Sequence, residues 1–425
     1  MIKIGDRLYD KAFFDARSAE LAKLAGIDGE HRGRYAVCFS DTTEWLALFF
    51  AIRDAGASVL PIHPATPYAA ARRLALHAGC DRLFYNSLAG EVLSERRVDD
   101  QPGQLLQMSS GTTGAPKLIA RSWESIRVEI ESYVRTFSAP EGMTPVVACP
   151  TTHSYGLICG ILVGIHRGVV PVIVDTANPK HVLKVLRETE RPLLYTSPAI
   201  LNMLAQLLPS GETIHAAMTS GTVLPEPWFE RIRARCARLF QQYGCSEAGC
   251  VAINPDLTSA NDMGYILPHA KAETGDSLET ASEIVLRKDD GSVIGTSDLG
   301  YVRPDGMLVF VSRMDDMINV AGLNVYPGDV EDAATSMPGV TDAVAFRKTD
   351  RFAGERVALL FSADDAVSPG AVREWLGRHL ASHQLPMEMI QVAEVPRQAN
   401  GKINRRDIAE RHAAGAFLPA QTGVA

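Results

Sequence analysis

The sequence predicts an α/β protein with two domains. Through roughly the first 250 residues, short apolar runs alternate with segments whose apolar side chains recur at helical spacing, a pattern typical of parallel sheets. After Pro255 the apolar runs are separated by turn residues such as Asp290-Gly291, which favours a small antiparallel section. With 425 residues, 46% of them hydrophobic, the chain exceeds the size that one hydrophobic core usually serves. We therefore expect a large N-terminal domain of mostly parallel sheets with helices, followed by a small α+β domain.

The first strand–helix unit carries the clearest local signals. Residues 35–39 (YAVCF) predict a strand, and Asp41 is placed to cap a helix with Glu44 in its first turn. One face of this helix is apolar, formed by Trp45, Leu48, Phe49 and Ile52 before Gly56. The same alternation predicts strands at residues 58–62, 146–149, 169–174 and 193–195, and helices beginning at Leu157, Pro179 and Pro198.

A second unit begins near Arg313. Apolar runs at 343–346 and 357–361 predict strands, and residues 372–380 predict a helix. We place the boundary near 312–316, which gives domains 1–312 and 313–425. The Ala- and Gly-rich tail, 412–425, is predicted to be frayed.

Composition excludes several classes of protein. The 42 basic and 50 acidic side chains give a net charge of −8, which argues against a broad nucleic-acid or anionic-membrane surface. The N-terminus lacks the apolar core of a secretory signal, and the longest apolar run, 157–165, is too short to span a bilayer. Seven scattered cysteines without a Cys-x-x-Cys pair indicate buried free thiols. We expect a cytoplasmic protein.

The stretch QMSSGTTGAPK at residues 107–117 follows an apolar pair and concentrates hydroxyl groups, glycines and a lysine. Such a loop presents backbone N–H groups, hydroxyl donors and a positive charge to a polyphosphate, although a flexible surface turn has similar composition. Its spacing differs from that of the P-loop, because Gly111 and Gly114 lie too close together and Pro116 precedes the lysine. The candidate phosphate ligands are Ser109, Ser110, Gly111, Thr112, Thr113, Gly114 and Lys117.

This loop resembles the signature loop of the adenylate-forming superfamily, which contains acyl-CoA synthetases, aryl-acid AMP ligases, nonribosomal-peptide adenylation domains and beetle luciferases. Residues 243–247 (YGCSE) resemble the Tyr-Gly-x-Thr-Glu motif of that family. The resemblance implies that Tyr243, beside Gly244, stacks on adenine, that Ser246 meets phosphate and that Glu247 holds Mg²⁺, a role suited to a carboxylate.

Three further segments follow in the order of the family. Residues 297–300 (SDLG) resemble Gly-Asp-Leu-Gly, so Asp298 would accept both ribose hydroxyls. Residues 312–319 (SRMDDMIN) resemble Gly-Arg-x-Asp-Asp-x-Ile-Lys, so Arg313 would contact ribose and Asp315 would be the hinge of a mobile C-terminal domain. Residues 396–405 (PRQANGKINR) resemble the closing motif that carries the catalytic lysine, here Lys402. The Asn-Gly pair before it is a tight-turn signal.

The resemblance implies an AMP-forming acid–thiol ligase that uses ATP and Mg²⁺. A carboxylate attacks the α-phosphorus to give an acyl adenylate and pyrophosphate, and a thiol then displaces AMP. No Gly-Gly-x-Ser site follows Lys402, so the acceptor is CoA or the phosphopantetheine of a separate carrier protein. The chain is compact for this family and stands alone; monomer and homodimer both stay open.

The acid is less well specified by the sequence. His153, Tyr155 and Gly221 are the candidate acyl-pocket residues, and the lack of an aspartate in 151–157 disfavours an α-amino acid. Residues 118–121 (LIAR) resemble aryl-acid AMP ligases of siderophore pathways, which points to an aryl or small apolar acid. The region after Arg313 is more similar to acyl-CoA synthetases, which keeps a fatty acyl-CoA or acyl-carrier-protein ligase open. A non-catalytic nucleotide-binding regulator and an oxidative, luciferase-like enzyme are the alternatives of other classes.

Overall fold

The computed structural model describes residues 1–27, 33–94, 102–109, 117–221, 224–320, 323–350, 354–398 and 402–417. Residues 110–114 of the predicted phosphate loop therefore lie outside the described residues, as does the Asn400-Gly401 turn. Ser109 is the last residue of strand β7, and its side chain is not among those described.

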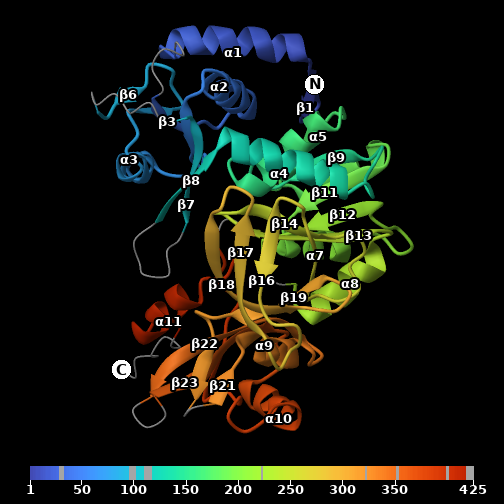
Figure 1. Ribbon diagram of the computed structural model, residues 1–425. Coiled ribbons are helices and arrows are strands. Elements are labelled where there is room, and N and C mark those ends of the chain that lie inside the picture. The colour runs from blue at the N-terminus through green and yellow to red at the C-terminus, as the bar shows by residue number, and fades with distance from the viewer. Residues whose placement is uncertain are drawn as a thin grey trace, which may run out of the picture.

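A six-stranded sheet forms the upper part of the molecule (Figure 1). Asp41 caps helix α2 as predicted, because its carboxylate accepts the backbone N–H groups of Thr43 and Glu44. Strands β3, β4, β5 and β7 run parallel, whereas β6 and β8 join antiparallel at the two edges. The order is β6 (Glu91–Val92), β5 (Arg82–Tyr85), β3 (Arg34–Cys38), β4 (Ser58–Pro61), β7 (Gln104–Ser109) and β8 (Lys117–Ser122), with helices α2 (Thr42–Asp54) and α3 (Tyr68–His77).

A 13-stranded sheet occupies the centre. Its first part is parallel and alternates with helices, as predicted. This part contains β9 (Thr144–Ala148), β10 (Val172–Ile173), β11 (Pro192–Thr196), β12 (Ala216–Thr219) and β13 (Leu239–Cys245), with β1 (Ile2–Ile4) and β2 (Arg7–Tyr9) at its edge. The helices are α4 (Trp123–Thr136), α6 (Pro179–Glu188), α7 (Pro198–Leu207) and α8 (Glu226–Arg235), whereas α1 (Lys11–Ala25) follows β2 and packs against α2 (Figure 1).

The antiparallel section is larger than predicted and belongs to the same sheet. It begins with β14, before Pro255, because the turn after β13 is short and returns the chain beside the strand it has just left. Its strands are β14 (Gly249–Asn254), β15 (Asp262–Ile266), β16 (Ala270–Glu273), β17 (Ser282–Lys288), β18 (Val293–Val302) and β19 (Met307–Arg313).

The helix predicted from Leu157 begins earlier and has a different form. It is a π-helix, η1 (Tyr155–Leu162), that continues into α5 (Val163–His166). Glycines let η1 pack closely: a Cβ on Gly160 would lie 2.8 Å from the Val147 side chain, and one on Gly156 2.5 Å from the Pro150 carbonyl oxygen. The strand predicted at 169–174 is reduced to Val172–Ile173.

A third sheet and its helices form a unit with its own hydrophobic core (Figure 1). Strand β19 of the large sheet ends at Arg313 and the third sheet starts at Ile318, so the chain passes from one sheet to the other between these two residues. Helix α11 includes His412 and ends at Ala413, so the tail is ordered further than predicted, and 418–425 lie outside the described residues. The elements are β20 (Ile318–Val320), β21 (Leu323–Val325), α9 (Pro327–Thr335), β22 (Val340–Asp350), β23 (Gly354–Ala363), α10 (Pro369–His379), β24 (Glu388–Gln391) and α11 (Arg405–Ala413).

All seven cysteines are free, and five of them are buried, as the sequence predicted. Among the helices of the described residues, none has the length and apolar character needed to cross a membrane.

Candidate active site

A buried carboxylate organises the end of the large sheet that faces the C-terminal unit. The Tyr243 hydroxyl donates to Oδ2 of Asp298 over 2.6 Å, and Nη1 of Arg313 donates to Oδ1 over 2.9 Å. Asp298 and Arg313 are directly opposed on β18 and β19, so strand register brings them together. Burial raises the pKa of Asp298, whereas Arg313 and Tyr243 oppose that shift. Three residues from separate predicted motifs therefore form one hydrogen-bonded group.

The backbone before Asp298 is unusual. Ser297 has a φ of 58°, in the left-handed region that favours glycine. The motif that this segment resembles has glycine at that position, a residue that adopts such a φ without strain. The Ser297 N–H donates to Oε1 of Glu283 over 2.9 Å, which helps to hold the conformation.

Lys402 extends from the C-terminal unit into this group. Its side chain is half-buried, and its Cε lies 3.8 Å from the position that a Cβ on Gly221 would take. Burial and the positive charge of Arg313 lower the pKa of Lys402, and Asp298 acts in the opposite direction. Lys402 therefore lies among the predicted nucleotide residues and is not a fully solvated loop lysine.

The predicted metal ligand lies on the turn between β13 and β14. Glu247 is partly exposed, and one of its carboxylate oxygens lies 3.5 Å from Nζ of Lys117, the first residue of β8. Gly244 sets the path of this turn, since a Cβ there would fall 1.9 Å from the carbonyl oxygen of Gly249. Ser246 lies on the same turn. Lys117 is the last residue of the predicted phosphate loop, so this end of the predicted loop lies beside the turn.

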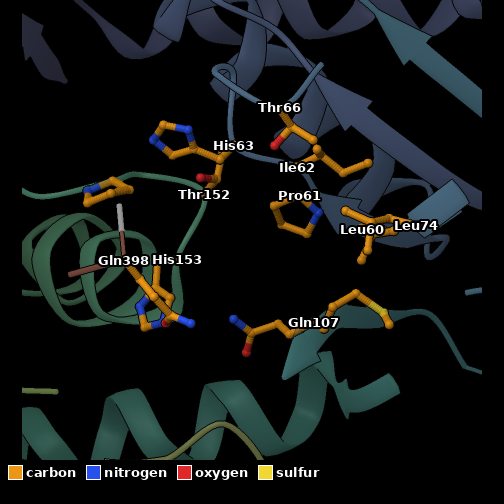
Figure 2. Close-up of a pocket in the computed structure, with 12 residues that line it drawn as sticks. Leu60, Pro61, Ile62, His63, Thr66, Leu74, Gln107, Thr152, His153 and Gln398 are labelled. Carbon is orange, nitrogen blue, oxygen red and sulfur yellow. The ribbon is translucent and has the colours of Figure 1, made fainter. Parts of the chain in front are cut away.

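A cavity of about 320 Å³ lies next to His153 (Figure 2). One part of its wall is apolar, with Leu60, Pro61, Ile62, Leu74, Met108 and Pro150. The other part is polar, with His63, Thr66, Gln107, Thr152, His153 and Gln398. Residues from the six-stranded sheet, the loop after β9 and the segment before Lys402 therefore share one cavity.

The polar wall presents neutral N–H donors. Burial, and secondarily the charge of Lys402, lowers the pKa of His153 to about 4. Its Nδ1 accepts the Tyr155 backbone N–H over 3.4 Å, which leaves the proton on Nε2. Oε1 of Gln107 accepts the Ser154 hydroxyl over 2.5 Å, so the amide NH₂ of Gln107 is the donor end.

Tyr155 has a different place from His153. Its hydroxyl donates to the Met218 carbonyl oxygen over 2.6 Å, and its ring packs against Tyr195 with centroids 5.9 Å apart. Tyr155 thus joins η1 to β12 and does not line the cavity. Gly221 lies beside Lys402.

Of the six polar cavity residues, the sequence prediction named only His153 as a site residue; the other five are His63, Thr66, Gln107, Thr152 and Gln398. His63 follows the parallel strand β4, and ligands of α/β sheets gather at the carboxyl ends of such strands. That signal could have identified His63. No local signal singles out Gln398, whose place in the cavity depends on how the C-terminal unit packs.

Two family models match the chain. The model described as "AMP-binding enzyme" matches residues 104–283, and "AMP-binding enzyme C-terminal domain" matches residues 329–402. Among characterised relatives, a 3,4-dihydroxybenzoate–[aryl-carrier protein] ligase of Bacillus anthracis is 36% identical over 96% of this chain and 98% of its own length. A 2-succinylbenzoate–CoA ligase of Lactococcus lactis is 24% identical over 73% of this chain and 71% of its own.

Solved structures share the whole fold. The ATP-bound MatB of Rhodopseudomonas palustris has a TM-score of 0.82 at 19% identity, with 97% of this chain and 95% of that chain covered. O-succinylbenzoate CoA synthetase (MenE) of Bacillus subtilis in complex with AMP has a TM-score of 0.80 at 18% identity, with 96% and 95% covered. The chain therefore belongs to the AMP-binding, adenylate-forming enzymes and is an AMP-forming acid–thiol ligase, which activates a carboxylic acid with ATP.

Proposed function

We propose that the acid is a small aryl acid and that the acceptor is the phosphopantetheine thiol of a separate aryl-carrier protein. The observation that carries this proposal is the 36% identity, along nearly the full length of both chains, to a 3,4-dihydroxybenzoate–[aryl-carrier protein] ligase. The similar CoA ligases match at 23–26%.

The wall around His153 supports an aryl acid. An aromatic ring needs apolar contact area, and ring oxygens need hydrogen-bond donors. The apolar side chains of the cavity offer contact area for the ring, and the neutral N–H groups of His153 and Gln107 offer hydrogen bonds to its oxygens. An α-amino acid would instead require a negative charge for its ammonium group, and this wall carries no carboxylate among the described residues.

We propose that the group around Asp298 binds the nucleoside of ATP. A carboxylate that already accepts from Tyr243 and Arg313 is held rigidly, which suits a ribose ligand. Lys402 then acts as the cation between the substrate carboxylate and the α-phosphate. Its approach to Asp298 and Arg313 from a separate unit supports this role in the adenylation step.

Mg²⁺ fits the turn that carries Glu247. This ion usually binds one or two carboxylates together with substrate phosphates, rather than an all-protein cage. Glu247 is a partly exposed carboxylate beside the start of β8, and the described residues hold no cluster of three or more His, Cys, Asp or Glu side chains suited to a metal. When bound, the ion would neutralise charge on the phosphates of ATP.

Acid-dependent exchange of labelled pyrophosphate into ATP tests the acid. The panel contains hydroxylated benzoates, 2-succinylbenzoate, short and long fatty acids, and α- and β-amino acids, each with the wild type and Lys402→Ala. Exchange with benzoates, lost in the variant, supports the proposal. Exchange restricted to fatty acids would overturn the aryl assignment and favour the fatty acyl alternative.

The acceptor is tested separately with the acid that gives exchange. Holo aryl-carrier protein and CoA are supplied at equal concentration, and thioester is quantified by mass spectrometry. Preferential loading of the carrier protein supports the proposal, and apo carrier protein is the matched control because it lacks the thiol. Preferential formation of the CoA thioester would refute the carrier assignment and leave the aryl assignment standing.

A further inference from the structure

A buried ion pair lies beneath the turn that carries Glu247. Arg121 of β8 and Glu129 of α4 pair through Nη2 and Oε2, and both side chains are only 2% exposed. Within the described part of the chain, Nε and Nη1 of Arg121 have no hydrogen-bond partner. Glu129 is therefore the counter-ion that the structure provides for this guanidinium.

The ion pair touches the turn directly. The second carboxylate oxygen of Glu129 accepts the backbone N–H of Cys250 over 2.7 Å. Gly249 has a φ of 81°, and a Cβ there would lie 2.4 Å from Oε2 of Glu129 and 2.6 Å from Nη2 of Arg121. The backbone of the turn thus rests against the charged groups, with no side chain between them.

The same pair also belongs to a second strand, because Arg121 is a residue of β8. Arg121 lies four residues after Lys117 on β8, and β8 follows the predicted phosphate loop. Nζ of Lys117 lies 3.5 Å from Oε1 of Glu247, and both side chains are partly exposed. The two strands are not neighbours in a sheet, because β8 belongs to the six-stranded sheet and β14 to the large one. The Arg121–Glu129 pair therefore links the two strands at this point.

We propose that Arg121 and Glu129 are positioning residues that hold the Glu247 turn in register with Lys117 at the start of β8, so that Glu247 and Lys117 act on the same Mg²⁺–ATP. This inference rests on the proposed role of Glu247. A buried ion pair is a poor source of stability, because apolar residues of similar volume often stabilise a protein equally well. A charged acceptor for the Cys250 N–H, locked by a guanidinium, instead fixes geometry.

The first test substitutes Glu129→Gln, which keeps an oxygen acceptor for the Cys250 N–H and removes the charge. We expect the Mg²⁺ concentration for half-maximal ATP binding to rise by about tenfold, which corresponds to a loss of one strong charge-assisted contact. Thioester formation from a supplied acyl adenylate, which needs no Mg²⁺–ATP, should stay within about twofold of wild type. ATP binding is followed by calorimetry across a Mg²⁺ titration, which requires no knowledge of the acid.

The matched control is Glu131→Gln on the same helix, where the carboxylate pairs with Arg127 at the surface. It should leave the Mg²⁺ titration unchanged. If the Glu129→Gln protein does not fold, the double variant Arg121→Met/Glu129→Leu is tested in its place. The double variant removes both charges together and so leaves no unpaired buried charge. A folded variant of either kind with the wild-type Mg²⁺ titration would overturn the proposal.

Glu247→Gln separates this proposal from the role on which it depends. A large shift in the Mg²⁺ titration for Glu247→Gln, together with a smaller shift for Glu129→Gln, supports both the metal-binding role of Glu247 and the positioning role of Glu129. If Glu247→Gln binds Mg²⁺–ATP like wild type, the assignment of Glu247 fails, and the positioning role fails with it.

Discussion

Lys402 shows how a single charge depends on its surroundings. It comes from the C-terminal unit, yet it is half-buried beside Gly221 and close enough to Arg313 and Asp298 for their charges to act on its pKa. A cation held in a partly dry site stabilises developing negative charge more strongly than one in water. These surroundings support the proposal that Lys402 acts in the adenylation step.

We predict that Lys402→Ala slows adenylate formation by about 10²–10³-fold, the usual effect of removing one preorganised charge-stabilising group. Thioester formation from a supplied adenylate should be retained. Single-turnover assays of each half-reaction measure both rates. Equal loss in the two halves would contradict the proposed role.

Ser297 illustrates strain at one residue. Its φ of 58° costs a residue with a Cβ about 1–2 kcal/mol, whereas glycine adopts it freely and loses somewhat more entropy on folding. We predict that Ser297→Gly raises the free energy of unfolding by up to about 1 kcal/mol, and that Ser297→Val lowers it. Urea denaturation of the three proteins measures the free energy of unfolding. If the Ser297→Gly protein is less stable than wild type, backbone strain is not the main factor at this position.

At the scale of elements, Arg405 connects three parts of the C-terminal unit. It begins α11, pairs with Glu331 of α9 over 2.7 Å, and pairs with Asp316, just before β20, over 2.8 Å. Two helices and the segment after β19 are therefore joined by one guanidinium. The pKa of Arg405 is raised despite its burial, because the two carboxylates outweigh desolvation.

We predict that Arg405→Met destabilises the C-terminal unit by about 3–5 kcal/mol, because it leaves two carboxylates without their cation. Trp375 of α10 packs in the same core and reports unfolding of this unit by fluorescence. Arg406→Met is the matched control, since Arg406 pairs with Glu410 on the exposed side of the same helix. An equal, small effect of both substitutions would rule out this role for Arg405.

At the scale of the molecule, the C-terminal unit contacts helix α8 of the large domain. Asp332 of α9 accepts the backbone N–H of Glu226 over 3.2 Å, and the guanidinium of Arg397 lies 5.0 Å from the ring centroid of Trp228. Contacts of this kind are compatible with relative motion of the two parts. The segment around Asp315, where the chain changes sheets, is the point at which such motion would pivot.

We predict that Asp315→Pro spares adenylation and slows thioester formation. Proline restricts rotation about the backbone at this position, and no described backbone hydrogen bond uses the Asp315 N–H. Comparison of the two half-reactions measures the effect, with Asp315→Ala as the control for loss of the pair with Arg313. Unchanged overall turnover in Asp315→Pro would reject the hinge assignment.

The contact at Asp332 should depend on pH. Burial raises the pKa of Asp332 to about 6, although the Glu226 N–H opposes the shift. A carboxyl with a raised pKa in the docked state binds its proton more tightly there, so the docked arrangement is favoured below about pH 6 and weakens as pH rises through it. We predict that a fluorescence-transfer pair across the two units reports more docking at pH 5.5 than at pH 7.5. Asp332→Asn, which cannot titrate, should abolish most of the difference in docking between the two pH values. An unaltered pH response in this variant would show that another group causes the pH dependence.

The nucleotide-binding class was readable from the sequence because its chemistry resides in short segments whose residues are adjacent along the chain, such as Tyr243 to Glu247. The same holds for local elements such as the Asp41 cap, whose hydrogen bonds reach only two and three residues ahead. The π-helix could not be predicted, because its form depends on the close approach of Gly156 and Gly160 to neighbouring residues.

Other properties were decided by tertiary structure alone. The cavity brings together His63, His153 and Gln398, which come from three distant parts of the chain. Arg121 belongs to a segment that resembles aryl-acid ligases, but folding buries it against Glu129. The sequence by itself thus determined the reaction class, since that depends on local motifs. The packing of sheets determined the shape of the cavity and the burial of the Arg121–Glu129 pair, because both depend on contacts between residues far apart in the chain.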